Sequence, residues 1–174
     1  IFNLSNNQKL IYNDVRKFGF IKFLNKFDLK DCLHLKKLGP EPLKNQFNFL
    51  FFKKNIHGKK RKIKDMLMDQ KFVAGLGNIY VNEILFQAKI NPFKKSYLIN
   101  LEENKRIVKY SKIILKKAID FGGSSIRDFK GITGKSGNFQ SEFKVYDRAK
   151  KRCSRNNCSG QISRKIISKR STFI

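Results

Sequence analysis

Two glycines and an asparagine stand directly before an apolar helical segment in the stretch Lys71–Glu83, KFVAGLGNIYVNE. Gly75 and Gly77 allow the backbone to turn sharply, because they carry no Cβ atom. Asn78 belongs to a residue type that caps helices, and the N-terminus of a helix attracts anions through its unpaired N–H groups and its dipole. The stretch therefore predicts an anion-binding turn; the alternative is an ordinary capped turn.

The charge of the chain indicates which anion such a turn would bind. Lysine and arginine total 39 of the 174 residues against 13 acidic residues, a formal net charge of +26. This excess is typical of proteins that bind DNA or RNA. A biased base composition of the gene would also enrich Lys, Asn, Ile and Phe, so charge alone does not prove nucleic-acid binding. No apolar run approaches the roughly 20 residues of a membrane span, and no secretory segment opens the sequence. We therefore expect a cytoplasmic protein associated with the nucleoid.

The remaining patterns mix strands and helices, which predicts an α+β fold. Leu10–Tyr12 and Phe18–Phe23 flank a polar loop, and their aromatic and β-branched residues are typical of a β-hairpin. Gly39–Pro42 is the clearest break in the chain and indicates a nearby domain boundary. A helix with a capping box begins at Asn100 and ends at the glycines that start with Gly122. We also expect three earlier helices, at residues 45–52, 59–70 and 78–89. A Gly/Ser-rich loop is expected at 131–140 and a strand at 143–146.

The three cysteines do not form an even disulfide framework. Cys153 and Cys158 lie close together between polar residues, which indicates half of a metal site in a reducing compartment. Two incidental thiols are the alternative. Cys32 lies in the segment DCLHL, where we expect a small buried hydrophobic side chain.

Six separated motifs extend through nearly the whole chain. They are DVRKFG at 14–19, LGPEPL at 38–43, MDQKFVAGLGNIY at 68–80, GGSSIRDF at 122–129, VYDR at 145–148 and KRSTF at 169–173. Together they resemble the formamidopyrimidine-DNA glycosylase family, base-excision enzymes that remove oxidised purines from DNA and then nick the abasic strand. LGPEPL resembles this branch rather than the related endonuclease VIII branch.

The resemblance implies three regions and a DNA partner. Residues 1–43 would be the end of an N-terminal β-sandwich domain with an intercalation loop. Residues 44–141 would be a helix–two-turn–helix domain that grips DNA, and 142–174 an incomplete β-hairpin zinc finger. The implied partner is duplex DNA with oxidised purines such as 8-oxoguanine or formamidopyrimidines, bound by a monomer.

The resemblance also assigns roles to single residues. Phe18 would be a wedge between base steps, and Arg16 would contact the base left opposite a flipped nucleotide; a buried Phe and a solvated Arg are the alternative. Lys60, Lys64 and Asn78 would contact the DNA backbone, although most of the basic run at 59–64 is expected to be a solvated charge cluster. Glu83 would belong to the lesion pocket, with a helix-surface glutamate as the alternative. The loop 131–139 would close over the everted base.

The C-terminal region departs from the family pattern. The family binds one Zn²⁺ through four cysteines, and here Cys153 and Cys158 supply the first pair with a Cys-x4-Cys spacing in place of Cys-x2-Cys. A structural zinc site needs four ligands, so we expect weak zinc binding or none. Arg170 matches the finger arginine that contacts phosphate at the lesion. The family also assigns it proton donation in the second elimination, although a guanidinium is an unusual general acid, which favours positioning of phosphate.

The catalytic residues of the family find no match at the start of the sequence. The family attacks the sugar with the amine of an N-terminal proline and forms a Schiff base, aided by a neighbouring glutamate and a lysine of the first domain. Ile1 stands at the first position, so we expect a fragment that does not itself excise bases, from a parent glycosylase/AP lyase. The alternatives are a non-catalytic DNA-binding remnant and a basic zinc-ribbon protein that binds RNA.

Overall fold

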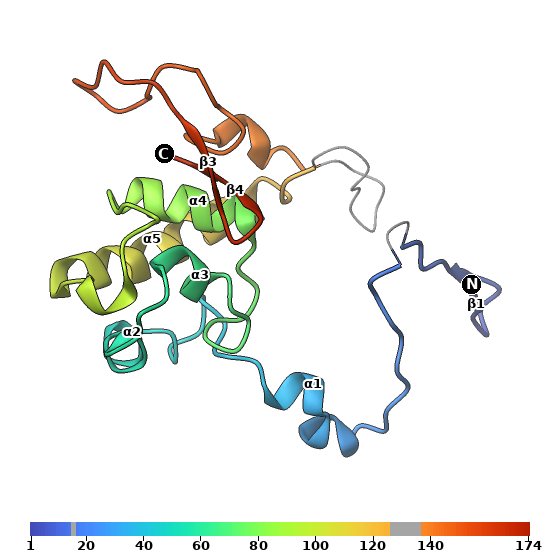
Figure 1. Ribbon diagram of the computed structural model, residues 1–174. Helices are drawn as coiled ribbons and strands as arrows, with labels where there is room; N and C mark the ends of the chain where they lie inside the picture. Colours follow the sequence, from blue (N-terminus) through green and yellow to red (C-terminus); the bar gives the residue numbers. More distant parts are fainter. Residues whose placement is uncertain (15–16, 126–136) are drawn as a thin grey trace. The chain divides into compact units, whose positions relative to one another are not determined.

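The computed structural model describes residues 1–14, 17–125 and 137–174. It divides into two compact units, Ile1–Lys36 and Lys37–Ile174, which are described separately (Figure 1). Among the described residues, no helix has the length and apolar character needed to cross a membrane.

The first unit has little regular structure. β1 (Phe2–Asn3) pairs antiparallel with β2 (Lys9–Leu10), and the short helices η1 (Asp28–Asp31) and α1 (Leu33–Lys36) follow. Cys32 is the one buried side chain among the described residues of this unit, which confirms its expected role.

The predicted hairpin of Leu10–Tyr12 with Phe18–Phe23 is wrong. The turn lies earlier, and residues 18–23 form no strand. Phe18 and Phe23 are more than 80% exposed. A strand pair is stable only when one face is covered by a core, and the described residues of this unit supply no such core for the aromatic side chains.

The second unit is built from helices. They are α2 (Phe49–Ile56), α3 (Ile63–Leu67), α4 (Asn78–Gln87), α5 (Leu101–Asp120) and the 3₁₀ turns η2 (Ser96–Leu98) and η3 (Phe139–Glu142). The expected capping box on α5 is present, since Asn100 Oδ1 accepts from Glu103 N and Glu103 Oε2 accepts from Asn100 N, both at 2.9 Å.

Two helices differ from their predicted bounds. α2 begins at Phe49 rather than at 45, because Asn48 Oδ1 caps it by accepting from Phe51 N at 3.0 Å. α3 covers only five of the residues predicted at 59–70, because the preceding backbone is extended and Lys62 forms a β-bridge with Lys95. Basic residues that looked helical are therefore held in an extended connection.

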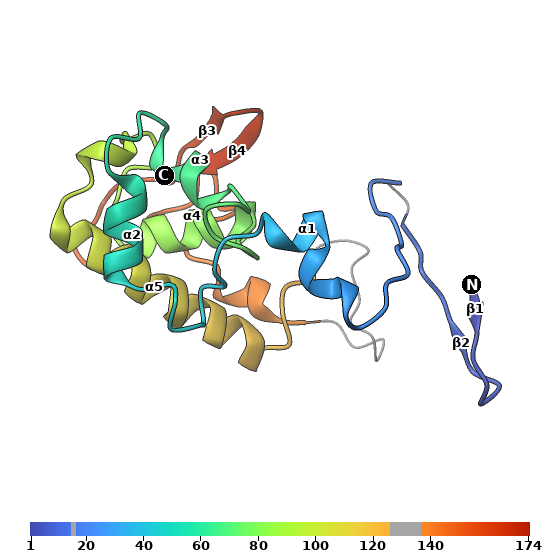
Figure 2. The ribbon, with the colours of Figure 1, turned by 90° about the horizontal axis from the view of Figure 1, so that it is seen from below.

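α4 lies at the centre of the second unit. Its buried residues Val81, Ile84 and Leu85 pack in one apolar core with side chains from α2, α3 and α5. Figure 2 shows α4 between α5 and the C-terminal hairpin, and α4 packs against both.

The C-terminal hairpin is formed by β3 (Arg164–Ile167) and β4 (Arg170–Phe173), with Arg164 opposite Phe173. Ser168 and Lys169 both have positive φ, 48° and 62°, as a two-residue turn with the right twist requires. The predicted strand at 143–146 is wrong. That segment forms bends and turns, and its N–H groups bond to a side chain of α4. The coarse prediction of a mixed α+β chain with a helical domain is confirmed.

Candidate nucleic-acid interface

The turn between α3 and α4 is held from inside by a glutamine. Gln70 Nε2 donates to Leu76 O at 2.9 Å, and Gln70 Oε1 accepts from Gly75 N at 2.8 Å. Gly75 has φ +86°, a conformation that other residues adopt only with strain. The turn therefore delivers the chain into α4 in a fixed direction.

The prediction that Asn78 caps α4 is wrong in its geometry. Gly77 is the capping residue and provides no side-chain hydrogen bond, while Asn78 is the first residue of the helix. Asn78 Nδ2 instead donates to Ser171 O in β4 at 3.1 Å. The helix N-terminus thus has no side-chain cap and no acidic residue in its first turn, which suits an anion.

Lys64 reaches the same carbonyl from α3. Its Nζ donates to Ser171 O and to Thr172 Oγ1, both at 2.8 Å, and the side chain is only 1% exposed. Burial lowers the pKa of Lys64 to about 8; Asp65 acts in the opposite direction, and Arg170 lowers the pKa further by repulsion. The structure therefore brings Lys64 and Asn78 to the carbonyl of Ser171, which directly follows Arg170 in β4, so the three side chains come from three elements. We call this group the Ser171 cluster.

The three side chains of the Ser171 cluster are not equivalent. Arg170 is exposed at the start of β4. Lys64 directs its ammonium at the hairpin rather than at solvent. In this conformation Arg170 is the most exposed member of the cluster, and Lys64 supports the hairpin that carries it.

Two buried polar residues of α4 join this helix to the C-terminal part of the chain. Neither is predicted as a phosphate contact. Asn82 Nδ2 donates to Asn78 O at 2.6 Å and to Asn78 Oδ1 at 3.3 Å, while Asn82 Oδ1 accepts from Phe173 N at 2.9 Å. Glu83 is 3% exposed, and its carboxylate accepts from the backbone N–H groups of Lys144, Val145 and Tyr146 at 2.8–3.2 Å. Glu83 is therefore not a helix-surface residue: it joins α4 to the segment before the hairpin. Its role in a lesion pocket stays a prediction.

Lys60 lies apart from the Ser171 cluster in the extended connection before α3. It is exposed and borders an open hollow of about 320 Å³ with His57, Gly58 and Tyr97. Neighbouring Arg61 pairs with Asp69 at 2.6 Å, so part of this basic run is engaged within the protein.

The predicted intercalation loop and lesion loop are only partly described. Arg16 and residues 126–136 lie outside the described residues. Phe18 is 82% exposed, so the alternative of a buried Phe does not hold. Phe139, at the end of the loop 131–139, is buried against Tyr80, Phe121 and Phe143.

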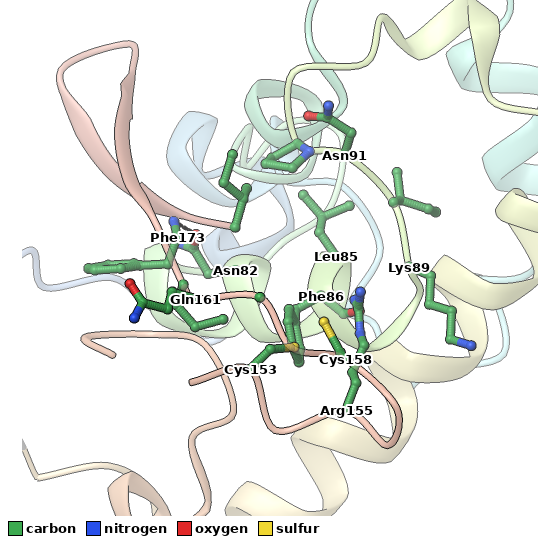
Figure 3. Close-up of a pocket in the computed structure, with 15 residues that line it drawn as sticks. Asn82, Leu85, Phe86, Lys89, Asn91, Cys153, Arg155, Cys158, Gln161 and Phe173 are labelled. Carbon is green, nitrogen blue, oxygen red and sulfur yellow. Dashed lines mark hydrogen bonds between the residues drawn. The ribbon is translucent and has the colours of Figure 1, made fainter. Parts of the chain in front are cut away.

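The cysteine pair borders a cavity of about 330 Å³ between the end of α4 and the C-terminal segment (Figure 3). Both thiols are free of disulfides. A hydrogen bond from the backbone of Gly160, followed by one from Cys153, lowers the pKa of the Cys158 thiol. Within residues 1–14, 17–125 and 137–174, no three His, Cys, Asp or Glu side chains are grouped closely enough to hold a metal. The two thiols suit zinc chemically but supply half of the ligands that a tetrahedral site requires.

Comparison with known proteins places this geometry in a family. The model of the formamidopyrimidine-DNA glycosylase H2TH domain matches residues 38–130, more than half of the chain. This chain belongs to the formamidopyrimidine-DNA glycosylase family. The matched residues contain α2, α3, the turn, α4 and α5, and so include Lys64 and Asn78.

Individual members of the formamidopyrimidine-DNA glycosylase family are similar over almost the whole chain. The formamidopyrimidine-DNA glycosylase of Bradyrhizobium sp. (strain ORS 278) is 40% identical over 179 residues, which cover 99% of this chain and 61% of the relative. The chain thus spans about three fifths of the length of this relative.

Two solved structures share the fold. The complex of Lactococcus lactis Fpg with DNA containing an abasic site has a TM-score of 0.84 at 36% identity and covers 92% of this chain and 58% of its own. MutM in complex with DNA containing carbocyclic 8-oxo-G has a TM-score of 0.82 at 36% identity and covers 92% and 57%.

Proposed function

We propose that this chain provides the DNA-gripping surface of a bifunctional DNA glycosylase/AP lyase, which excises oxidised purines from duplex DNA and nicks the abasic strand. The observation that carries the proposal is the Ser171 cluster, where residues more than 90 positions apart meet at one carbonyl. Family membership and the abasic-site and 8-oxo-G complexes of similar proteins support the choice of DNA as partner.

In this proposal the N-terminus of α4 and Arg170 bind phosphates beside the lesion. Hydrogen-bond donors from two elements, held by Lys64, Asn78 and Asn82, would grip the backbone without rearrangement on binding. Phosphate contacts fix register and orientation, so Arg170 acts as a positioning group. Lys60 adds a further backbone contact from the connection before α3.

Base flipping is assigned to the first unit. Phe18 would enter the stack beside the extruded nucleotide, and Arg16 would donate hydrogen bonds to the base left opposite. An aromatic side chain that is 82% exposed is suited to such a wedge, because most Phe side chains of this size are buried.

The finer domain assignments complete the proposal. Residues 1–43 belong to the end of a β-sandwich domain, 44–141 to the helix–two-turn–helix domain, and 142–174 to a β-hairpin zinc finger. Cys153 and Cys158 would give two of the four thiolates. A bound zinc ion would act as a structural tie.

The chemical step is assigned outside these 174 residues. Their three prolines, Pro40, Pro42 and Pro92, are internal and have amide nitrogens, so none offers the amine that attacks the sugar. Binding is the part of the reaction that the described residues carry out.

Two measurements test the proposal. The 174-residue chain should bind a duplex containing an abasic-site analogue more tightly than the intact duplex of the same sequence, and Phe18→Ala should reduce this preference while Lys44→Gln leaves it unchanged. Equal affinity for the two duplexes would overturn the proposal. The protein as expressed from its gene should form a covalent adduct with an 8-oxoguanine duplex under borohydride. Lesion binding without an adduct would leave a non-catalytic DNA-binding protein.

A further inference from the structure

The outer face of α5 carries four lysines at helical spacing: Lys105, Lys109, Lys112 and Lys116, here called the lysine row. At 3.6 residues per turn these positions fall within one sector of roughly 60°. The buried residues of α5, among them Ile107 and Ile114, fall on the opposite side. Three of the four lysines are exposed and Lys112 is half-buried.

The charges of the lysine row are poorly compensated. Lys105 pairs with Glu102 at 2.8 Å, and Asp120 stands four positions after Lys116. The residues three and four positions from Lys109 and Lys112, however, are lysine, arginine or apolar. Like charges at these spacings destabilise a helix by a few tenths of a kcal/mol per pair. The neighbouring helix α2 adds the exposed Lys53 and Lys54, so the packed surroundings increase the positive charge.

The composition of the row points to phosphate rather than to a protein. No other residue type occupies its sector, and the exposed apolar residues of α5, Leu101, Ile113 and Ile119, lie outside it. Lysine is depleted in protein–protein interfaces, whose binding energy comes largely from Trp, Tyr and Arg. Flexible ammonium groups about 6 Å apart along a helix suit a phosphate backbone instead.

The lysine row and the Ser171 cluster face different directions. α4 packs against both α5 and β4 and lies between them (Figure 2). The row points away from the core side of α5, and therefore away from α4 and the hairpin. A duplex held at the Ser171 cluster is therefore expected to leave the row free.

We propose that the lysine row binds the phosphate backbone of a second segment of duplex DNA, so that one chain holds two segments at once. This inference rests on the proposed function only for the first segment, which occupies the Ser171 cluster. A searching enzyme with two such faces passes from one segment to another without full release.

Bridging of two undamaged duplexes tests the proposal. One duplex carries a donor dye and the other an acceptor, and energy transfer is measured as the 174-residue chain is added. The wild-type chain should bring the duplexes together. The triple variant Lys109→Gln, Lys112→Gln, Lys116→Gln should reduce bridging at least about tenfold, since three phosphate contacts are lost. Its affinity for a single abasic-site duplex should stay within about twofold, because those contacts lie on the other face.

A matched variant controls for net charge. Lys44→Gln, Lys89→Gln, Lys150→Gln removes the same charge from three exposed positions in different parts of the second unit and should retain bridging. Gln is a good helix former, and the α5 variant also loses like-charge repulsion, so its melting temperature should not fall.

The outcomes separate this inference from the proposed function. Bridging that persists in the α5 variant, or a wild-type chain that does not bridge, would show that the lysine row does not bind a second DNA segment. An acidic protein would then be the partner to test. Equal loss of bridging and single-duplex binding would place the row in one continuous footprint and would also overturn it. Lesion preference of the single duplex is independent of all three results.

Discussion

Lys64 is a basic residue that the fold uses as a buried hydrogen-bond donor. Its pKa of about 8 lies below the ordinary value of 10.5, so the unfolded chain binds the proton more tightly than the folded chain. Stability rises with pH wherever the unfolded state holds more protons. The contribution of Lys64 to the free energy of unfolding therefore increases from about pH 8 to pH 10.5, and the neutral amine can still donate to Ser171 O and Thr172 Oγ1.

This pH dependence is measurable as a difference in the free energy of unfolding between the wild type and a variant without the Lys64 ammonium. Between pH 7 and pH 10 the free energy of unfolding of the wild type should rise by about 2 kcal/mol relative to that of Lys64→Met. Urea unfolding of both proteins at the two pH values checks this result. A constant difference between them would show that the Lys64 ammonium is not desolvated in the folded state.

Asn82 is expected to stabilise the hairpin that carries Arg170. Asn82→Ala leaves the buried N–H of Phe173 without an acceptor and should lower the free energy of unfolding by about 1–3 kcal/mol. Asn104 is the matched control, since it is equally buried but its Oδ1 has no partner among the described residues. Asn104→Ala should cost less in the same urea experiment; a larger cost would contradict the role given to Asn82.

At the scale of elements, Glu83 joins α4 to residues 144–146. Glu83→Gln keeps one oxygen that can accept from Val145 N and Tyr146 N, but it turns an NH₂ group toward Lys144 N and removes the charge of the acceptor, and it should lower the free energy of unfolding by about 1–3 kcal/mol. Glu102→Gln, on the exposed start of α5, should leave the free energy of unfolding nearly unchanged. Faster amide exchange at Val145 and Tyr146 in Glu83→Gln alone would locate the effect; equal exchange in both variants would contradict it.

The sequence predicts the helices of the second unit better than its connections. Gly75, Gly77 and Gly122 mark turns that the structure contains, and the Asn100–Glu103 capping box begins α5 as expected, because these signals act locally. The segment 143–146 has a strand-like composition but bonds to a glutamate 60 residues earlier, which no local pattern encodes.

In the candidate site, too, the sequence predicts local features better than long-range contacts. The residue types of the site are visible in the motifs, and Lys64 and Asn78 do meet, at the carbonyl that follows Arg170. Their arrangement around Ser171 O is a product of tertiary packing. Local sequence therefore predicts Asn78 as the cap of α4, whereas Gly77 is the capping residue. Buried Asn82 gives no signal in sequence beyond its position one turn after Asn78.

At the scale of the whole molecule, zinc should have little effect on the 174-residue chain. Two thiols cannot close a tetrahedral site, and a ligand that does not bind the folded state tightly does not stabilise it. Addition of Zn²⁺ should leave the melting temperature of the wild-type chain unchanged. In the presence of Zn²⁺, Cys153→Ser should melt at the same temperature as the wild type. A zinc-dependent rise that is lost in Cys153→Ser would show that other ligands complete the site.

The salt dependence of DNA affinity tests the central claim most directly. The dissociation constant of an abasic-site duplex is measured over a range of salt concentrations for the wild type and for Arg170→Gln. If Arg170 contacts a phosphate, the slope of log K against log salt should be about one unit shallower in the variant, with affinity lost equally for different sequences. An unchanged slope would show that the Ser171 cluster does not face the DNA backbone.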